Sequence, residues 1–412
     1  MERVILHSDC NCFYASVECL YHPELRNKPV AVGGDVEHRH GIILTKNYIA
    51  KKYGVKTGEA LWQAKQKCPD LVILPPNYPR YLRFSQMARK IYLDYTDQVE
   101  PFGLDECWLD VTGSSRKGAG MAIAQEISGR IKAELGITVS IGVSYNKIFA
   151  KLGSDYKKPD AITRIGRDNF KEIAWPLDAG DLLYVGHAMQ RKLTAYGVHT
   201  IGDIASTPEY LLKSWFGKWG SVLYCFANGH DISPVAKYDD TVAIKSIGNS
   251  TTTPRDLTCD EDAKIILYVL ADSVARRLRQ QGLKGRVVGI SVRDNGLCSF
   301  TRQHKLQNYT SITKEIAQAG LELFRQNYHW QQPVRSLGIN ISDLTGDSVS
   351  TQTDLFSDET QRERKEDLDR ATDWLKRRFG THVVQPAILL KDQRLSGLDP
   401  IHDNTIHPVG YF

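Results

Sequence analysis

The fold is decided by Val99–Thr112, which reads V-E-P-F-G-L-D-E-C-W-L-D-V-T. Its apolar residues, Phe102 and Trp108 among them, predict a hairpin or short strand pair with Asp105 and Glu106 side by side at its centre. Adjacent carboxylates repel, and in a half-buried setting each raises the pKa of the other unless a cation neutralises both. Oxygen ligands favour Mg²⁺ or Mn²⁺ over zinc. The stretch therefore predicts either a hard-cation site at a sheet surface or an exposed acidic turn.

The composition is that of a globular protein. The 412 residues exceed one ordinary core, so we expect two to four domains. Hydrophobic residues make up 42% and charged residues 25%, and the formal charge of +5 permits a nucleic-acid partner without requiring one.

The cysteines and the apolar runs indicate the cellular setting. The eight cysteines are scattered, and Cys10 with Cys12 forms neither a zinc ligand set nor a disulfide framework. The N-terminal apolar run is too short for a signal peptide, and no later stretch is apolar enough to span a bilayer. We expect a soluble protein of a reducing cytosol, with no membrane partner.

A third acid comes from the N-terminus. Val4–Asp9 reads as a buried strand that ends in an acid, and Cys10–Glu18 reads as a turn into a helix. An acid at a strand end, aimed at a second acid pair, is how three carboxylates gather around two metal ions.

Three motifs carry a family resemblance. Asp9–Glu18 reads D-C-N-C-F-Y-A-S-V-E, Leu104–Val111 reads L-D-E-C-W-L-D-V, and Ser140–Asp160 reads S-I-G-V-S-Y-N-K-I-F-A-K-L-G-S-D-Y-K-K-P-D. In this order and at these separations they resemble the Y-family, translesion-type DNA polymerases, most closely the bacterial DNA polymerase IV and UmuC-like members. The resemblance runs from residue 1 to about residue 345.

The resemblance implies an α+β, right-hand polymerase. Its parts are a palm with a ferredoxin-like sheet plus helices, small fingers, a helical thumb with a helix-hairpin-helix, and a little finger. The implied bounds are 1–21 and 75–165 for the palm, 22–74 for the fingers, 166–232 for the thumb, 233–242 for a linker, 243–345 for the little finger and 346–412 for a C-terminal tail. Helices at 80–97 and 118–135 are expected to back the palm sheet.

The resemblance also implies the catalytic ligands. Asp9, Asp105 and Glu106 match the three metal-binding carboxylates of the family, and the backbone carbonyl of Cys10 matches a main-chain ligand. Two Mg²⁺ ions per site are implied, with Mn²⁺ as the alternative. Asn11 stands where many members have a second acid, and we do not count it as a ligand.

The nucleotide contacts are implied in the same way. Tyr14, beside Phe13, matches the steric gate, a ring beneath the sugar that leaves no room for a 2′-hydroxyl. Its alternative is a core aromatic at a helix start.

The fingers contribute a helix over 45–54, which we expect Thr45 to cap. Thr45, Tyr48 and Lys51 match the triphosphate contacts of the family, as does Lys158 in a Lys-Lys-Pro loop. Lys51 replaces the arginine common there, so a point charge remains in place of a bidentate contact. An ordinary solvated basic face is the alternative.

A thumb is predicted from two segments. Leu182–His187 and Arg191–Asp203 resemble a helix-hairpin-helix, whose tight Gly-x-Gly turn offers backbone N–H groups to a DNA phosphate. Only Gly186 is kept, because Tyr184 replaces the first glycine, so we expect a distorted turn. A plain helical packing module is the alternative.

The segment after the linker reads as β-α-β-β-α-β. Between residues 241 and 345 it carries 14 basic and 9 acidic residues, an excess equal to that of the whole chain. A basic sheet of this shape fits a module that lies along the DNA backbone. Arg276, Arg277 and Arg279 are candidates for phosphate contact, or else a solvated helix face.

The tail contains Q-T-D-L-F at Gln352–Phe356 within a polar, acidic stretch. The pentapeptide resembles the bacterial sliding-clamp-binding peptide, and its alternative is docking on the protein's own surface. The predicted clamp contacts are Gln352, Asp354, Leu355 and Phe356.

An amphipathic helix is predicted to follow over Lys365–Phe379, with an apolar side of Leu368, Ala371, Trp374, Leu375 and Phe379. Thr381–Phe412 suggests no function.

The resemblance, together with these features, implies a low-fidelity, translesion DNA polymerase that extends primers from dNTPs by two-metal nucleotidyl transfer, without proofreading, in DNA repair. The expected partners are primer-template DNA, dNTP and the sliding clamp, and the expected state is a monomer in the bacterial cytoplasm, at the nucleoid. A nucleotidyl cyclase and a catalytically inactive scaffold in DNA repair are the alternatives.

Overall fold

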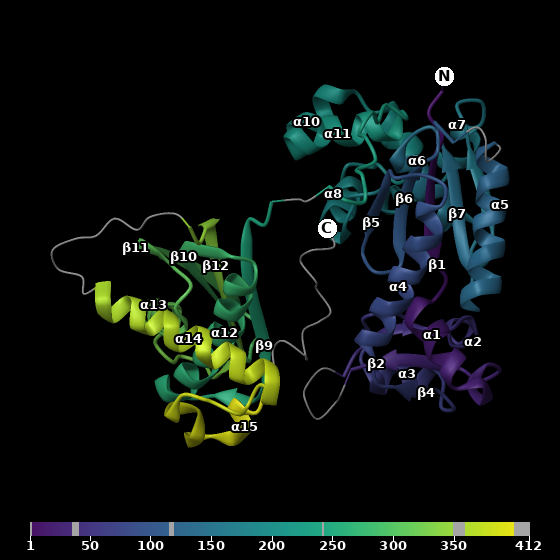
Figure 1. Ribbon diagram of the computed structural model, residues 1–412. Coiled ribbons are helices and arrows are strands. Elements are labelled where there is room, and N and C mark those ends of the chain that lie inside the picture. Colours follow the sequence, from purple (N-terminus) through teal and green to yellow (C-terminus); the bar gives the residue numbers. More distant parts are fainter. Residues whose placement is uncertain (1, 35–40, 115–118, 241–242, 349–358, 399–412) are drawn as a thin grey trace. The chain divides into compact units, whose positions relative to one another are not determined.

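The structure is a computed structural model that describes residues 2–34, 41–114, 119–240, 243–348 and 359–398. It divides into two compact units, the first made of residues 2–34 and 42–240 and the second of residues 243–348 and 359–398 (Figure 1). Each unit is described by itself. The finer division into palm, fingers and thumb stays a prediction.

The first unit is built on a five-stranded sheet in the order β5-β6-β1-β7-β8. Its strands are β1 (Ile5–Cys10), β5 (Val99–Phe102), β6 (Glu106–Asp110), β7 (Val139–Ser144) and β8 (Ile162–Ile165). The predicted hairpin is confirmed, because β5 and β6 pair antiparallel. Gly103 supplies the positive φ of +83° that the tight turn requires. Strand β1, buried throughout, lies between β6 and β7 at the centre of the sheet.

Helices cover both faces of this sheet (Figure 1). They are α4 (Tyr78–Leu93), α5 (Gly120–Arg130), which continues as a π-helical turn to Leu135, and α6 (Lys147–Tyr156). Ser8 hydrogen-bonds Tyr92 of α4, whereas its neighbour His7 hydrogen-bonds Ser154 of α6. Because successive strand residues point to opposite faces, α4 and α6 lie on opposite sides of β1. Gly142 lets α6 approach closely, since a Cβ there would meet the carbonyl oxygen of Ala150 at 1.8 Å.

A small second sheet, β3-β2-β4, lies in the segment predicted to form the fingers. Its strands are β2 (Val30–Gly33), β3 (Ile43–Lys46) and β4 (Val72–Leu74), and the helices near it are α1 (Phe13–Tyr21), α2 (Tyr48–Lys52) and α3 (Leu61–Lys67), with a 3₁₀ turn at Pro23–Leu25. The predicted cap at Thr45 is wrong. Thr45 pairs with Val32 inside β3, and Asn47 caps α2 by accepting a hydrogen bond from the Ala50 N–H. An asparagine side chain at an extended position is a strong N-cap, so the helix starts three residues later.

Short helices form the rest of the first unit. They are α7 (Phe170–Ala174), α8 (His187–Ala195), α9 (Ile201–Ser206), α10 (Glu209–Phe216) and α11 (Lys218–Ala227), with a 3₁₀ turn at Ala179–Asp181. Tyr184 adopts φ +73°, the left-handed conformation that the missing glycine would take, at a cost of roughly 1 kcal/mol. Its ring lies 5.4 Å from that of Trp219. Tyr184 thus keeps a glycine-like conformation in the turn that we expected to be distorted.

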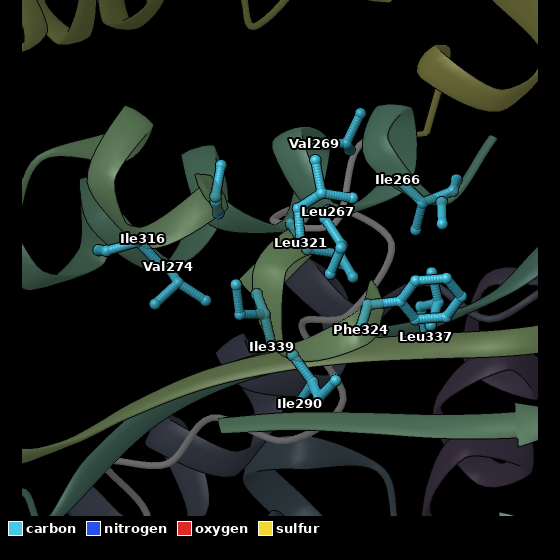
Figure 2. Close-up of a cluster of buried hydrophobic side chains, with 14 of the residues drawn as sticks. Ile266, Leu267, Val269, Val274, Ile290, Ile316, Leu321, Phe324, Leu337 and Ile339 are labelled. Atoms are coloured by element: carbon cyan, nitrogen blue, oxygen red, sulfur yellow. The ribbon is translucent and has the colours of Figure 1, made fainter. Parts of the chain in front are cut away.

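The second unit confirms the predicted β-α-β-β-α-β order. Its elements are β9 (Ser246–Leu257), α12 (Asp260–Gln280), β10 (Leu283–Asp294), β11 (Ser299–Thr310), α13 (Thr313–Asn327) and β12 (Val334–Gly346), in a sheet ordered β11-β10-β12-β9. Figure 2 shows α12 and α13 packing their apolar residues against one face of the sheet, where Ile290 and Ile339 point toward the helices. On the strands next to these residues, Ser291, Arg293 and Asn340 are exposed. The other sheet face is therefore open and carries polar and basic side chains.

A C-terminal helix, α14 (Glu359–Phe379), packs on the helical side of this unit, followed by a 3₁₀ turn at Ala387–Lys391 and α15 (Gln393–Ser396). The predicted helix is confirmed, and its apolar side is largely exposed. Leu368, Trp374 and Phe379 are exposed, while Asp373 and Lys376 are buried.

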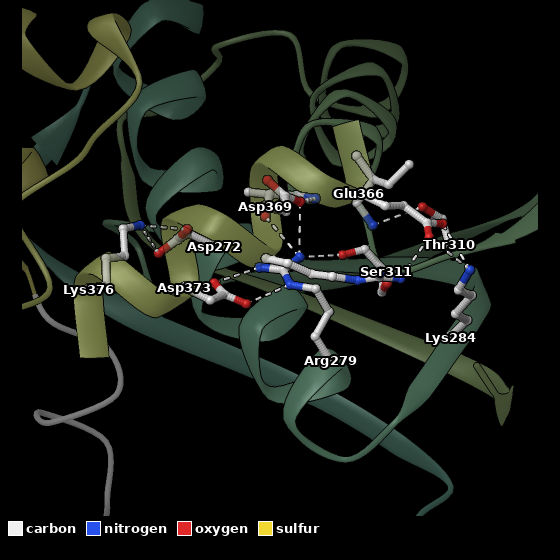
Figure 3. A network of polar contacts seen from close by, with 12 residues as sticks. Asp272, Arg279, Lys284, Thr310, Ser311, Glu366, Asp369, Asp373 and Lys376 are labelled. Atoms are coloured by element: carbon white, nitrogen blue, oxygen red, sulfur yellow. Dashed lines mark hydrogen bonds and ion pairs between the residues drawn. The ribbon is translucent and has the colours of Figure 1, made fainter. Parts of the chain in front are cut away.

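Ion pairs hold α14 in place, as Figure 3 shows. Arg279 donates to both carboxyl oxygens of Asp373 and to Asp369, and Lys376 contacts Asp272 at 2.8 Å. The charged face of this helix therefore determines its orientation.

Candidate active site

Strand register brings the first two acids together. Asp9 of β1 lies directly opposite Glu106 of β6, and His7 lies opposite Trp108. Residues opposite each other in a sheet share a face, and His7 faces α6, so Asp9 and Glu106 also lie on the α6 side. The predicted meeting of an N-terminal acid with the hairpin acids is what the backbone shows.

Asp105 is the last residue of the turn that precedes β6. Its carbonyl oxygen accepts a hydrogen bond from the Cys10 N–H at 3.0 Å, which ties the turn to the end of β1. Burial, reinforced by the charges of Asp9 and Glu106, raises the pKa of Asp105 to about 7. Burial also raises the pKa of Asp9, against the opposing charge of Lys158. Both shifts have burial as their largest cause, and repulsion between the neighbouring acids adds to it.

Two lysines supply part of the compensation. Lys158 Nζ lies 2.6 Å from Asp9 Oδ2, and Lys151 Nζ lies 2.7 Å from Glu106 Oε2. Lys158 was predicted as a triphosphate contact, and here it pairs with a predicted metal ligand. Lys151 was not predicted as a site residue, although it sits in the Ser140–Asp160 motif one helical turn before Asp155.

His7 lies behind the acids. It is fully buried, its Nδ1 is 2.8 Å from Ser154 Oγ, and its Nε2 is 3.4 Å from Glu106 Oε2. Burial, with help from the charge of Lys151, lowers the pKa of His7 to about 3. A neutral imidazole adds no cation here, so the positive charge beside Glu106 comes from Lys151.

The donor set fits a hard divalent cation. Within the described ranges, no three His, Cys, Asp or Glu side chains lie close enough together to hold a metal ion as they stand. Lysine ammonium groups contact Asp9 and Glu106. The available donors are nevertheless all oxygen atoms, and burial with the neighbouring acids raises the pKa values of Asp9 and Asp105. Oxygen ligands of this kind suit Mg²⁺ and Mn²⁺.

An aromatic platform lies next to the acids. The ring of Tyr14 stacks on that of Tyr81 with centroids 4.2 Å apart, and Tyr78 meets both rings edge-on. Tyr81 is itself fixed by donating to Glu18 at 2.8 Å. Burial and the nearby charge of Asp105 raise the pKa of Tyr14, so the phenol stays neutral. Tyr78 and Tyr81, three residues apart at the start of α4, were not predicted, and their spacing was the available signal.

The other residues predicted to contact the nucleotide are Tyr48, Lys51, Thr45 and Phe13, and their surroundings differ. Tyr48 Oη donates to Asn11 Oδ1 at 3.3 Å, and Lys51 Nζ lies 5.6 Å from the Tyr48 ring. Asn11 is buried and also binds Ser140 and Thr138 through its amide. Thr45 lies in β3, partly exposed, and Phe13 is buried against Tyr14 and Tyr81.

The DNA candidates differ from one another. Gly186 directly precedes α8, and a Cβ added there would meet no atom within 4 Å. Arg276, Arg277 and Arg279 do not lie on a free surface. Arg276 is buried, Arg277 donates to the Gly248 carbonyl, and Arg279 is held by α14. The exposed phosphate-binding face predicted for them is wrong, because α12 packs between the sheet and α14.

The clamp candidates Gln352, Asp354, Leu355 and Phe356 lie outside the described residues. No helix in the described part of the chain has the length and apolar character needed to cross a bilayer.

Comparison with known proteins assigns the family. Residues 8–155 match the model of the impB/mucB/samB family, residues 244–355 match its C-terminal domain, and residues 180–231 match a thumb domain described for DNA polymerase-iota. A Y-family DNA polymerase chimera of known structure covers 82% of this chain and 98% of its own at a TM-score of 0.72, with 24% identity, which shows a shared fold. The family models, together with the curated relatives described next, show that the chain belongs to the Y-family, translesion DNA polymerases.

The relatives are more specific. The DNA polymerase IV of Acetivibrio thermocellus is 56% identical over 397 residues, which cover 96% of this chain and all of that protein. The DNA polymerase IV of Moorella thermoacetica is 39% identical over 94% of this chain and 96% of its own length. The chain is a DNA-directed DNA polymerase that acts on primer-template DNA and dNTP, and its family uses divalent metal ions.

Proposed function

We propose that Asp9, Asp105, Glu106 and the carbonyl of Cys10 hold two Mg²⁺ ions, with Mn²⁺ as the alternative, for template-directed nucleotidyl transfer. The observation that carries this proposal is the pairing of Asp9 with Glu106 at the end of β1, beside an Asp105 whose pKa is raised to about 7. When bound, such ions lower the pKa of the primer 3′-hydroxyl and offset charge on the leaving pyrophosphate.

The protein's own side chains perform the remaining tasks. Lys158 and Lys51, with the hydroxyl groups of Thr45 and Tyr48, bind triphosphate oxygens and offset the charge that develops during transfer. Tyr14 closes the space beneath the sugar, and Phe13 supports it from behind.

Primer extension tests the reaction itself. The purified protein should extend a primer on damaged and undamaged templates with Mg²⁺ and stop with a chelator. Formation of a cyclic nucleotide in place of extension would instead support the cyclase alternative, which the named relatives disfavour.

Tyr14→Ala should raise ribonucleotide incorporation by about 100-fold relative to the parent protein, because it opens the space that the ring fills. Single-nucleotide incorporation of rNTP against dNTP measures the effect. Tyr14→Phe keeps the ring stacked on Tyr81 and serves as the matched control. Unchanged discrimination in Tyr14→Ala would remove the steric-gate assignment.

We place the DNA path on Gly186 and on the open face of the second unit's sheet rather than on α12. Arg293 and Lys305 lie on this face, since they pair with Ser299 and Val287, while the buried residues Val288 and Val292 point the other way. Small neighbours such as Ser291 and Gly338 leave the face flat enough to follow a phosphate backbone.

The segment Gln352–Phe356, with Leu355 and Phe356 as anchors, is proposed to bind the bacterial sliding clamp. Leu355→Ala combined with Phe356→Ala should lower clamp-stimulated synthesis at least about tenfold, because apolar anchors dominate such contacts. Clamp-free synthesis should stay unchanged, and Thr353→Ala in the same segment is the control. Equal loss of both activities would point to a folding role and contradict the proposal.

The expected setting follows from the bacterial relatives. We propose a monomer that works in the bacterial cytoplasm at the nucleoid, and sedimentation of the purified protein tests its oligomeric state.

A further inference from the structure

One carboxylate links the two lysines of the site. Asp155, in the last turn of α6, has its Oδ1 2.8 Å from Lys158 Nζ and its Oδ2 3.7 Å from Lys151 Nζ. The same ammonium groups contact Asp9 and Glu106, at 2.6 and 2.7 Å. The five side chains form a continuous sequence of charges, Asp9–Lys158–Asp155–Lys151–Glu106. Asp155 therefore touches neither proposed metal ligand directly, yet it shares a partner with each.

This arrangement follows from the sequence spacing. Lys151 and Asp155 are four residues apart on α6, so they lie on one helical face. Lys158 follows the end of the helix, and its side chain reaches back to Asp155, three residues earlier. Burial alone would raise the pKa of Asp155, but the charges of Lys151 and Lys158 outweigh it and lower the pKa from its usual value. Asp155 thus remains ionised and available to both lysines.

Cation binding creates a conflict at the outer members. Asp9 and Glu106 each hold an ammonium group within hydrogen-bonding distance, and a divalent cation on the same oxygen atoms would be repelled by it. The ammonium groups must therefore leave these carboxylates before the carboxylates bind metal. A lysine that leaves a partly buried partner needs another acceptor, because an unpaired charge there is costly. For both lysines, Asp155 is already in place.

We propose that Asp155 is a positioning residue that receives Lys151 and Lys158 when Asp9 and Glu106 take up divalent cations, and so makes the carboxylates available at lower metal concentration. The inference rests on the metal-site assignment of the proposed function. It also gives Lys158 a fixed anchor on the side of the site where the triphosphate is expected. Asp155 itself binds neither metal nor substrate.

The test is a titration of the full-length protein with Mn²⁺ alone, in which the free ion is followed by electron paramagnetic resonance. Asp155→Asn should weaken Mn²⁺ binding about three- to tenfold, because the lysines then have no acceptor other than Asp9 and Glu106. Asp155→Glu, which keeps the carboxylate, should restore most of the affinity. Asp160→Asn is the matched control: Asp160 lies two residues from Lys158 but pairs with Lys132, so its loss should leave Mn²⁺ binding unchanged.

A lysine-free background separates positioning from simple charge. With Lys151→Met and Lys158→Met in place, Asp155→Asn should no longer affect Mn²⁺ binding. An equal loss in this background, or unchanged Mn²⁺ binding in the single variant, overturns the proposal. Circular dichroism verifies that each variant is folded. Asp105→Ala in the same titration tests the metal site itself, since unchanged binding there would reject the proposed function and not merely the role of Asp155.

Discussion

Asp105→Ala combined with Glu106→Ala should reduce primer extension by at least about a thousandfold, which corresponds to roughly 4 kcal/mol of lost transition-state stabilisation. The two carboxylates lie beside Asp9 at the end of β1. Their negative charge is partly offset by nearby lysines, such as Lys158. Without the two carboxylates Asp9 is the only proposed carboxylate ligand left, and one carboxylate cannot hold two divalent ions. A single-turnover extension assay with Mg²⁺ measures the loss.

The control for this experiment lies on the same strand. Asp110→Asn alters a carboxylate at the far end of β6 that lies 3.8 Å from the Arg3 guanidinium. Asp110 also accepts a hydrogen bond from the Thr112 N–H, and the Asn side-chain oxygen can accept the same bond. The Asp110→Asn variant should keep extension within a few-fold of the parent protein. DNA binding of the double variant, measured by fluorescence anisotropy, should persist, because the proposed DNA surfaces are elsewhere. Residual extension above about one tenth of the parent rate would reject the assignment of Asp105 and Glu106.

The three acids of the site could be predicted from the sequence because each lies in a local pattern that indicates a strand or a hairpin. The acid pair at Asp105 and Glu106 and the strand ending at Asp9 are separate signals, and antiparallel pairing of β1 with β6 joins them. What the sequence could not reveal is which groups neutralise these acids. Lys151 and Lys158 reach them by side-chain geometry across α6 and β1, which no spacing rule contains.

Tyr184 shows a different limit. A missing glycine indicated a distorted turn, because a side chain at positive φ is strained. In the structure Tyr184 accepts the strain at φ +73°, with its ring beside Trp219, a residue 35 positions later. The strain that the local rule predicts is therefore present, and a long-range aromatic contact that the rule does not contain accompanies it.

The contact between α12 and the C-terminal helix shows a third limit. Arg279 was offered as a phosphate contact or as part of a solvated helix face. Both interpretations treat a charged residue as a surface residue. The structure pairs Arg279 with Asp373 and Asp369 and buries the charged face of α14 instead. Pairing of this kind depends on two segments 90 residues apart, so the pattern of either one alone points the wrong way.

Asp373→Ala should therefore release α14 from α12. The side chains of Arg279 and Asp373 are 10% and 8% exposed, and removal of one partner of a buried pair costs about 3–5 kcal/mol because the other charge is left without full compensation. Asp369 still contacts Arg279 and accepts from the Thr313 N–H, so we expect the lower end, about 3 kcal/mol. Amide hydrogen exchange across 359–379 should accelerate about a hundredfold if the helix detaches as a unit.

Asp367→Ala provides the comparison. Asp367 lies on the same helix, is 75% exposed and contacts only Arg370, at 3.6 Å, among the ion pairs of the described residues. Its loss should leave exchange within about twofold of the parent protein, because exposed pairs contribute little. If Asp373→Ala exchanges no faster than Asp367→Ala, ion pairing does not hold the helix, and its exposed residues Leu368 and Trp374 would need another explanation. Primer extension without a clamp should survive Asp373→Ala, since the acids at Asp9, Asp105 and Glu106 belong to the other unit.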